Sequence, residues 1–178
     1  MLKDRPSCLN ASHTWWSKLP SSIPVTLVTQ LSGDRIPQLQ AQCDVWLGPL
    51  AATIYLPLLS PAGRDLPPDA RQRLLETVDA VQKLFNYAEK QNKCQLRLLL
   101  INEVFSGQLA AKALYPVNSL RNWARLMADT PLIANIDVDM LPSLAMSKSM
   151  LDEKEAQKYV QACSQDKHVY ILPAFETL

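Results

Sequence analysis

The sequence predicts an α/β fold built around one mostly parallel sheet with helices on both faces. Two observations lead to this prediction. Short apolar runs stand at residues 25–30, 51–56, 96–101 and 132–136. The stretches between them carry apolar residues at helical spacing, and strands that alternate with helices pair in parallel through right-handed crossovers. The length of 178 residues suits one domain with a sizeable core.

The N-terminal residues lack such a pattern. Residues 1–22 are polar and mixed, contain two prolines and show no clear period. We therefore expect a poorly ordered leader over residues 1–22, followed by one domain over residues 23–178. Trp15 and Trp16 are the exception within the leader, and we expect them to pack against the domain as an anchor.

The first part of the domain is predicted to form a strand, a helix and a second strand. The strand covers residues 25–30 (VTLVTQ), after which Gly33 breaks the chain. Asp34 is predicted to cap the N-terminus of the helix. A Gly-Pro pair ends the helix ahead of the second strand at residues 51–56. The apolar face of the helix consists of Ile36, Leu39, Cys43 and Trp46.

The most regular helical pattern follows a loop at residues 60–68. Asp69 and Gln72 have the spacing of a capping box at the start of this helix. The helix is expected to cover one face of the sheet and to lead into the strand at residues 96–101. Its apolar stripe consists of Leu74, Val78, Val81, Phe85 and Ala88.

The second half of the chain is predicted to form a helix, a strand, a helix and a last strand. Asn118 is a candidate cap for the first helix, which leads into the strand at residues 132–136. We expect a loop after Pro142, a helix over residues 151–165 and a final strand over residues 168–175. The buried face of the first helix is predicted to hold Leu120, Trp123, Ala124 and Met127.

Two carboxylates end the strand that begins at Leu132. If the strand continues to Met140, its side chains alternate, and Asn135, Asp137 and Asp139 share one face. Unpaired carboxylates at the end of a buried strand are costly, and hard divalent cations take oxygen ligands. The pattern therefore favours a cation site. The alternative is that the two acids form a turn or cap a helix.

Composition narrows the classes of function. The formal net charge is +1 with acids and bases mixed along the chain, so no nucleic-acid-binding surface is predicted. No run of about eighteen apolar residues occurs, so no membrane span is predicted. Residues 1–20 contain no continuous apolar region, so we expect neither a secretory signal nor a membrane anchor there.

The cysteines and one short motif leave questions open. The four cysteines show no C-x-x-C pair and no zinc spacing, and their disulfide pairing cannot be assigned from spacing. Cys43 and Cys163 lie on apolar helix faces, where we expect small buried hydrophobes. Residues 10–12 (Asn-Ala-Ser) form an N-glycosylation sequon, which matters only if the chain enters the secretory pathway.

Four blocks of the sequence occur in the order of a known family. They are VTLVTQLS at residues 25–32, AATIYLPLL at 51–59, YPVNSLRNWARLMADTPLIANIDVDMLP at 115–142 and LPAFETL at 172–178. With these blocks the chain resembles the LARGE-type glucuronyltransferases of glycosyltransferase family 49, over about residues 24–178. The resemblance implies a GT-A fold, incomplete at the C-terminus, and residence in the Golgi lumen.

The resemblance also implies a ligand set. Asp137 and Asp139 would hold Mn²⁺ or Mg²⁺, which bridges the diphosphate of a UDP-sugar. The family transfers the sugar, glucuronate by resemblance, to a glycan or glycoprotein acceptor with inversion. The residues expected to contact the nucleotide sugar are Tyr115, Asn118, Arg121 and Asn122 upstream of the acids, with Gln30 and Arg35 after the first strand. For Arg121 the alternative is a surface arginine that pairs with an acid, and for Asn118 it is a helix cap alone.

In the resembling family, the catalytic base and a third metal ligand lie beyond the PAFET block. We therefore do not expect His168 to be that ligand, and Glu176 either orients a sugar hydroxyl or is exposed. This chain alone is expected to turn over a UDP-sugar poorly. Two alternatives stay open: a non-catalytic GT-A remnant that binds nucleotide or a protein partner, and a phosphatase of the haloacid-dehalogenase type. The phosphatase ranks last, because its D-x-D motif belongs on the first strand.

Overall fold

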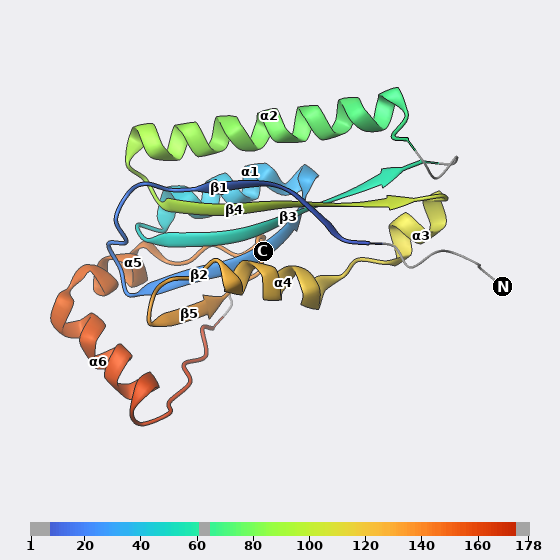
Figure 1. The fold of residues 1–178 in the computed structure, drawn as a ribbon. Coiled ribbons are helices and arrows are strands. Elements are labelled where there is room, and N and C mark those ends of the chain that lie inside the picture. The colour runs from blue at the N-terminus through green and yellow to red at the C-terminus, as the bar shows by residue number, and fades with distance from the viewer. Residues whose placement is uncertain (1–7, 61–64, 174–178) are drawn as a thin grey trace, which may run out of the picture.

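The computed structural model describes residues 8–60 and 65–173 and contains a five-stranded sheet of order β1-β4-β3-β2-β5 (Figure 1). Strands β2 to β5 run parallel, and β1 pairs antiparallel with β4. The predicted α/β class is confirmed. The strands are β1 Asn10–Trp16, β2 Val25–Ser32, β3 Pro49–Leu59, β4 Gln95–Phe105 and β5 Leu132–Asn135. The helices are η1 Gly33–Arg35, α1 Ile36–Val45, α2 Pro68–Gln91, α3 Gln108–Ala113, α4 Val117–Leu126, α5 Leu144–Leu151 and α6 Glu153–Ser164.

Helices cover both faces of the sheet, as predicted. On one face, α1 and α2 bury the larger apolar cluster, which includes Leu27, Leu98 and the fully buried Trp46. On the other face, α4 packs Leu120 and Ala124 against the sheet in a smaller cluster. Residues next to each other along a strand point to opposite faces, so the apolar runs of β2, β3 and β4 supply both clusters.

The leader prediction is wrong for residues 10–16, which form the edge strand β1. Only Trp15 in this strand is buried, and its indole donates a 2.9 Å hydrogen bond to Gln82 of α2. Backbone pairing with β4 fixes the remaining residues, whose side chains are mostly exposed. An edge strand of this kind has no apolar pattern to detect. Residues 1–7 lie outside the described part of the chain.

Two predicted helix caps are also wrong. Asp34 lies inside the short helix η1, and α1 begins after Arg35 without a side-chain cap. Helix α2 begins at Pro68 with Pro67 at the cap position, so Asp69 falls in the first turn. A proline in the first turn has no N–H to satisfy and sets the helical φ, which removes the need for a capping side chain.

The last third of the chain differs most from the prediction. Residues 144–150, expected as a loop, belong to α5, and the Ser143 hydroxyl at its N-terminus accepts a 3.1 Å hydrogen bond from the Met146 N–H. The predicted strand at residues 168–175 is absent from its described part, residues 168–173, and the remainder lies outside the described residues. In residues 168–173 Tyr170 packs edge-on against Tyr159 of α6, at 5.0 Å between ring centroids.

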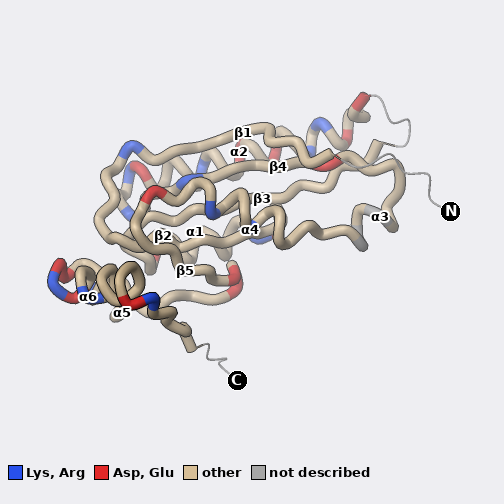
Figure 2. Tube along the Cα trace, turned by 60° about the horizontal axis from the view of Figure 1, so that its bottom comes forward, with Lys and Arg blue, Asp and Glu red and all other residues tan. Residues whose placement is uncertain are grey.

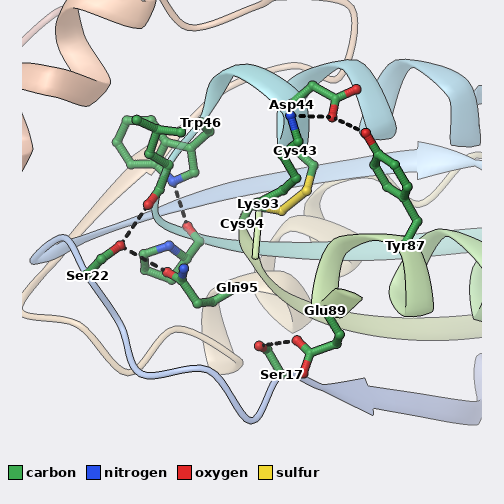
Figure 3. Close-up of a disulfide and its surroundings, with 12 residues drawn as sticks. Ser17, Ser22, Cys43, Asp44, Trp46, Tyr87, Glu89, Lys93, Cys94 and Gln95 are labelled. Atoms are coloured by element: carbon green, nitrogen blue, oxygen red, sulfur yellow. Dashed lines mark hydrogen bonds and ion pairs between the residues drawn. A yellow bond between two sulfur atoms is a disulfide. The ribbon is translucent and has the colours of Figure 1, made fainter. Parts of the chain in front are cut away.

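A disulfide joins Cys43 of α1 to Cys94, which directly precedes β4 (Figure 3). Both residues are fully buried within the larger apolar cluster, with 5.3 Å between their Cα atoms. The bond closes a 51-residue separation in the sequence. Cys43 is therefore buried as predicted but paired, whereas Cys8 is exposed and Cys163 half-buried, both as free thiols.

Acidic and basic residues are interspersed along the chain, most visibly on α2 and α6 (Figure 2). The strands of the central sheet carry few of them, because their side chains form the two cores. None of the helices within residues 8–60 and 65–173 combines the length and hydrophobicity that a bilayer-spanning segment needs.

Candidate functional site

A pocket of about 470 Å³ lies at the carboxyl ends of β2 and β5. In open α/β sheets, this edge is where ligands bind. Its walls come from the end of β2, the residues that follow it, the start of α4 and the turn after β5. Six residues predicted from the sequence line it: Gln30, Arg35, Tyr115, Arg121, Asp137 and Asp139. Four further residues that were not predicted complete the lining: Leu31, Ser32, Val117 and Val138.

The two acids do not lie on a continuous strand, which corrects the prediction. The β5 ladder ends at Asn135, after which the Ile136 N–H makes one more hydrogen bond to the Val28 carbonyl. The chain then turns, and the Met140 N–H bonds to the Asp137 carbonyl at 3.0 Å. Alternation of exposure nevertheless continues, because Val138 is buried between the exposed Asp137 and Asp139. Both carboxylates therefore face the same pocket from a turn.

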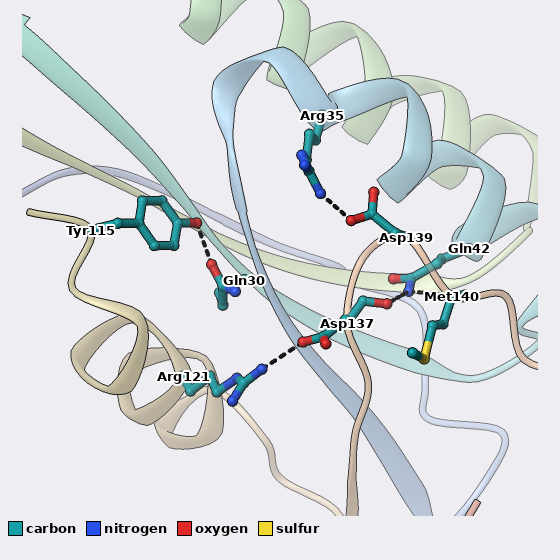
Figure 4. A network of polar contacts seen from close by, with 8 residues as sticks. All are labelled: Gln30, Arg35, Gln42, Tyr115, Arg121, Asp137, Asp139 and Met140. Atoms are coloured by element: carbon teal, nitrogen blue, oxygen red, sulfur yellow. Dashed lines mark hydrogen bonds and ion pairs between the residues drawn. The ribbon is translucent and has the colours of Figure 1, made fainter. Parts of the chain in front are cut away.

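Gln42 of α1 holds this turn, and its role was not predicted. The side chain is fully buried, and its Nε2 donates to the carbonyls of Asp137 at 2.9 Å and Met140 at 2.7 Å (Figure 4). Gln42 gives the Met140 carbonyl a donor and adds a second donor to the Asp137 carbonyl, so it holds the turn where the ladder ends. The sequence does contain a signal, since Gln42 is a polar residue between Leu39 and Cys43 on the apolar face of α1.

Each acid is paired with an arginine. The Arg121 Nη2 lies 2.5 Å from the Asp137 Oδ1, and the Arg35 guanidinium contacts the Asp139 carboxylate (Figure 4). All four side chains are about half exposed, with between 41% and 55% of each accessible. Pairs this accessible to water contribute little to stability. The guanidinium groups are therefore free to exchange partners at small cost.

Tyr115 lies on the opposite wall of the pocket. Its hydroxyl donates to the Gln30 amide oxygen, and its ring packs edge-on against Tyr55 with centroids 5.3 Å apart. Burial raises the pKa of the Tyr115 phenol to about 12, while Arg35 lowers it, Asp34 raises it and Arg121 lowers it. The phenol is thus a hydrogen-bond donor at neutral pH, on the wall of the pocket that faces the acids.

Asn118 and Asn122 do not line the pocket. Both are exposed on α4, and Asn118 lies inside the helix, whose cap position is Pro116. The predicted cap role for Asn118 is therefore wrong. Trp123, predicted to be buried on this helix, is 41% exposed. His168 lies in the exposed segment after α6, and Glu176 is outside the described residues.

The donor set suits a hard cation in part. Two carboxylates separated by one residue face the pocket, and the groups that now contact them are cations. Oxygen ligands of this type are those that Mg²⁺ and Mn²⁺ prefer, and phosphate oxygens and water commonly complete such shells. Within the described residues, no group of three or more His, Cys, Asp or Glu side chains is placed to hold a metal ion.

A larger cavity of about 790 Å³ lies at the other end of β2. It is bounded by residues 21–24, the residues before β5, and helices α5 and α6. None of the predicted site residues lines it. Size alone therefore does not identify the site, and the convergence of charged and aromatic residues favours the smaller pocket.

Comparison with known proteins bears on the chemistry of this pocket. The model of a family described as the glycosyl-transferase for dystroglycan matches residues 70–178, which include α4, β5 and both acids. The chain belongs to this family. The α/β fold with its mostly parallel sheet is consistent with a GT-A-like domain, as the family resemblance implied.

Curated relatives of this glycosyl-transferase family align with most of the chain. The xylosyl- and glucuronyltransferase LARGE2 of Mus musculus is 30% identical over 159 residues, which cover 89% of this chain and 19% of the relative. Human LARGE2 is 32% identical over 159 residues, which cover 89% of this chain and 18% of the relative. Human LARGE1 is 30% identical over 169 residues, which cover 93% of this chain and 18% of the relative. The chain thus spans about a fifth of the length of these relatives.

Proposed function

We propose that the chain binds the diphosphate of a UDP-sugar together with Mn²⁺ or Mg²⁺ at the pocket formed by Asp137 and Asp139. The supporting observation is the convergence of six residues from four segments on one pocket at the carboxyl edge of the sheet. In this proposal the metal, when bound, neutralises charge on the diphosphate leaving group. In this proposal the sugar, glucuronate by family resemblance, is transferred to a glycan acceptor.

The arginines have a defined part in this proposal. Without ligand, Arg35 and Arg121 neutralise the two carboxylates. With the carboxylates bound to a cation, both guanidinium groups would be without these partners beside the diphosphate. Arginine forms strong, charge-assisted hydrogen bonds with phosphate oxygens. We therefore infer that the arginines move from carboxylate to diphosphate as metal and nucleotide bind together.

The other wall would hold the rest of the nucleotide. Tyr115 offers an aromatic face and a phenolic donor, and Gln30 offers an amide at the end of β2. Aromatic faces stack on nucleobases, and amide groups pair with their edges. We expect the wild type to bind UDP but not CDP. Tyr115→Ala should lower the affinity for UDP, and Tyr115→Phe should keep most of it. Equal binding of both nucleotides by the wild type would count against this placement.

The second candidate is nucleotide binding without sugar transfer. The arginine pairing of both acids favours it, because the charges are already neutralised without a metal. Transfer assays with a UDP-sugar and glycan acceptors, run beside UDP-binding measurements, distinguish the two. Binding with transfer supports a transferase, and binding without transfer supports the second candidate.

A further inference from the structure

An N-glycosylation sequon lies at the start of the edge strand β1. Residues 10–12 (Asn-Ala-Ser) are the only N-x-S/T sequence in the 178 residues. Asn10 is exposed and lies next to a shift in the β1–β4 register between Ala11 and His13. Strand β1 is terminal in the sheet order, so its outer edge pairs with no other strand among the described residues. The motif is therefore at the surface, where an attached glycan has room in the folded chain.

The buried disulfide indicates the compartment in which the chain folds. Cys43 and Cys94 are both fully inaccessible and belong to the apolar cluster that α1 and α2 cover. Disulfides of this kind form and persist in oxidising compartments and are rare in the cytosol. A sequon is used only in a protein that enters the secretory pathway, and this pathway is oxidising. The disulfide thus points to the route on which the sequon can be used.

We propose that Asn10 carries an N-linked glycan. The amide Nδ2 of Asn10 attacks the anomeric carbon of a polyprenyl-diphosphate-linked oligosaccharide. A carbon–nitrogen bond forms and the carbon–oxygen bond to the diphosphate breaks. The diphosphate leaves with the bonding electron pair, and the amide nitrogen loses one of its two protons.

The folded structure accommodates this product. In the fold, Asn10 Nδ2 donates a 3.2 Å hydrogen bond to Asn102 Oδ1. A primary amide nitrogen has two hydrogens, so the glycosylated nitrogen keeps one for this bond. The Ser12 hydroxyl, which the modifying enzyme must recognise, donates to the Leu100 carbonyl at 3.1 Å. Because both side chains of the sequon bond to β4, the glycan is added before β1 pairs with β4.

A glycan here also has a physical consequence. An edge strand exposes unpaired N–H and C=O groups that can pair with another molecule. A bulky, hydrated group near the start of β1 hinders such pairing. Trp16, which is 48% exposed at the other end of the strand, is the kind of apolar neighbour that makes an uncovered edge prone to association.

The test uses the full chain expressed behind a cleavable secretory signal in eukaryotic cells, with the lumenal and secreted pools combined. Samples are treated with peptide-N-glycosidase, and intact mass and the peptide containing Asn10 are analysed. Wild type and Ser12→Thr should lose the mass of one core glycan, whereas Asn10→Gln and Ser12→Ala should show no change. Asn86→Gln is the control, because Asn86 is exposed on α2 outside any sequon.

The same samples are alkylated without reduction to score the disulfide. Lumenal wild type that contains the Cys43–Cys94 bond but loses no mass on glycosidase treatment would overturn the proposal. A glycan that persists in Asn10→Gln would overturn it as well. Neither result depends on nucleotide binding, so this inference stands or fails separately from the proposed function.

Discussion

The Arg121 Nη2 lies 2.5 Å from the Asp137 Oδ1 and so joins α4 to the turn after β5. The companion pair between Arg35 and Asp139 joins the same turn to the short helix after β2. Each proposed metal ligand therefore already has a cationic partner. A metal that binds here must displace both guanidinium groups. Removing one of these arginines should therefore change the affinity for the metal and the affinity for the nucleotide in opposite directions.

The first prediction concerns Arg121→Gln. Removing this positive charge should strengthen Mn²⁺ binding without nucleotide, because a competing cation is gone. It should weaken UDP binding in Mn²⁺, because a phosphate contact is lost. We expect changes of about two- to tenfold in each direction, as for partly exposed charge pairs. Calorimetry of Mn²⁺ and of UDP measures both.

Arg125→Gln is the matched control for this prediction. Arg125 lies one turn further along α4, donates to Asn135 at 3.3 Å and does not line the pocket. Its loss should leave both affinities near wild type. If Arg121→Gln weakens the binding of both Mn²⁺ and UDP, or strengthens both, then Arg121 does not move from the carboxylate to the diphosphate.

The second prediction concerns Gln42→Met, which keeps the volume but removes the amide. The carbonyls of Asp137 and Met140 then lose their buried donor. We expect a loss of about 1–3 kcal/mol in the free energy of unfolding. UDP binding in Mn²⁺ should fall too, because the turn no longer holds its acids in place. Urea denaturation and calorimetry test this, with Gln38→Met on the exposed side of α1 as control. Unchanged stability would show that Gln42 does not support the turn.

The third prediction concerns the disulfide. Replacing Cys43 and Cys94 together by alanine removes a bond that closes a 51-residue separation. Such a bond limits the entropy of the unfolded chain, and its loss should lower the free energy of unfolding by about 2–4 kcal/mol. Urea denaturation is the measurement, with the double replacement of the free Cys8 and Cys163 as control. A midpoint equal to that of wild type would mean that the bond contributes no stability.

The fourth prediction concerns alkaline pH. Burial raises the pKa of Tyr115 to about 12, from 10.0 in an exposed phenol. Burial raises the pKa of Tyr55 as well, and its hydrogen bond to Glu103 adds to the rise. The folded state therefore keeps protons that the unfolded state loses, so this part of the stability is present below pH 10 and declines as pH rises toward 12. Tyr115→Phe should make the decline shallower in urea titrations at stepped pH. An equally steep decline in the variant would contradict this assignment.

Much of the fold follows from the sequence because apolar runs and helical periodicity report burial. Strands β2, β3 and β4 lie in the sheet interior, so their runs are nearly continuous and were found in order. Strand β1 was missed for the opposite reason, since an edge strand whose residues are mostly exposed has no such pattern. Helix α5 was missed because it is short, rich in Ser, Met and Lys, and has no long apolar stripe.

Most of the residues that line the candidate pocket were named from the sequence, but their geometry was less predictable. Alternation around Asp137 and Asp139 correctly placed both side chains toward the same side. It did not reveal that the ladder stops at Asn135, because the side chain that holds the following turn, Gln42, lies 95 residues before Asp137. Arg121 was named from the family resemblance, and Gln30 and Arg35 were named from analogy with the GT-A fold, because local patterns do not single them out. Asn118 and Asn122, taken from the same block, are on the exposed side of α4.

The most direct test of the account is calorimetry of UDP with and without Mn²⁺ on wild type, Asp139→Asn and Asn135→Ala. Asp139→Asn keeps the side-chain shape and removes one charge from the pocket. Asn135→Ala is the control, because Asn135 precedes the turn and does not line the pocket. Linkage requires metal and UDP to strengthen each other by the same factor.

We predict that Mn²⁺ tightens UDP binding to wild type and to Asn135→Ala. Asp139→Asn should lose about tenfold or more of that affinity in Mn²⁺ and change little without it. Two results would contradict the metal-dependent nucleotide site. One is a wild type that binds UDP equally well with and without Mn²⁺, and the other is an Asp139→Asn variant that binds UDP in Mn²⁺ as well as the wild type does.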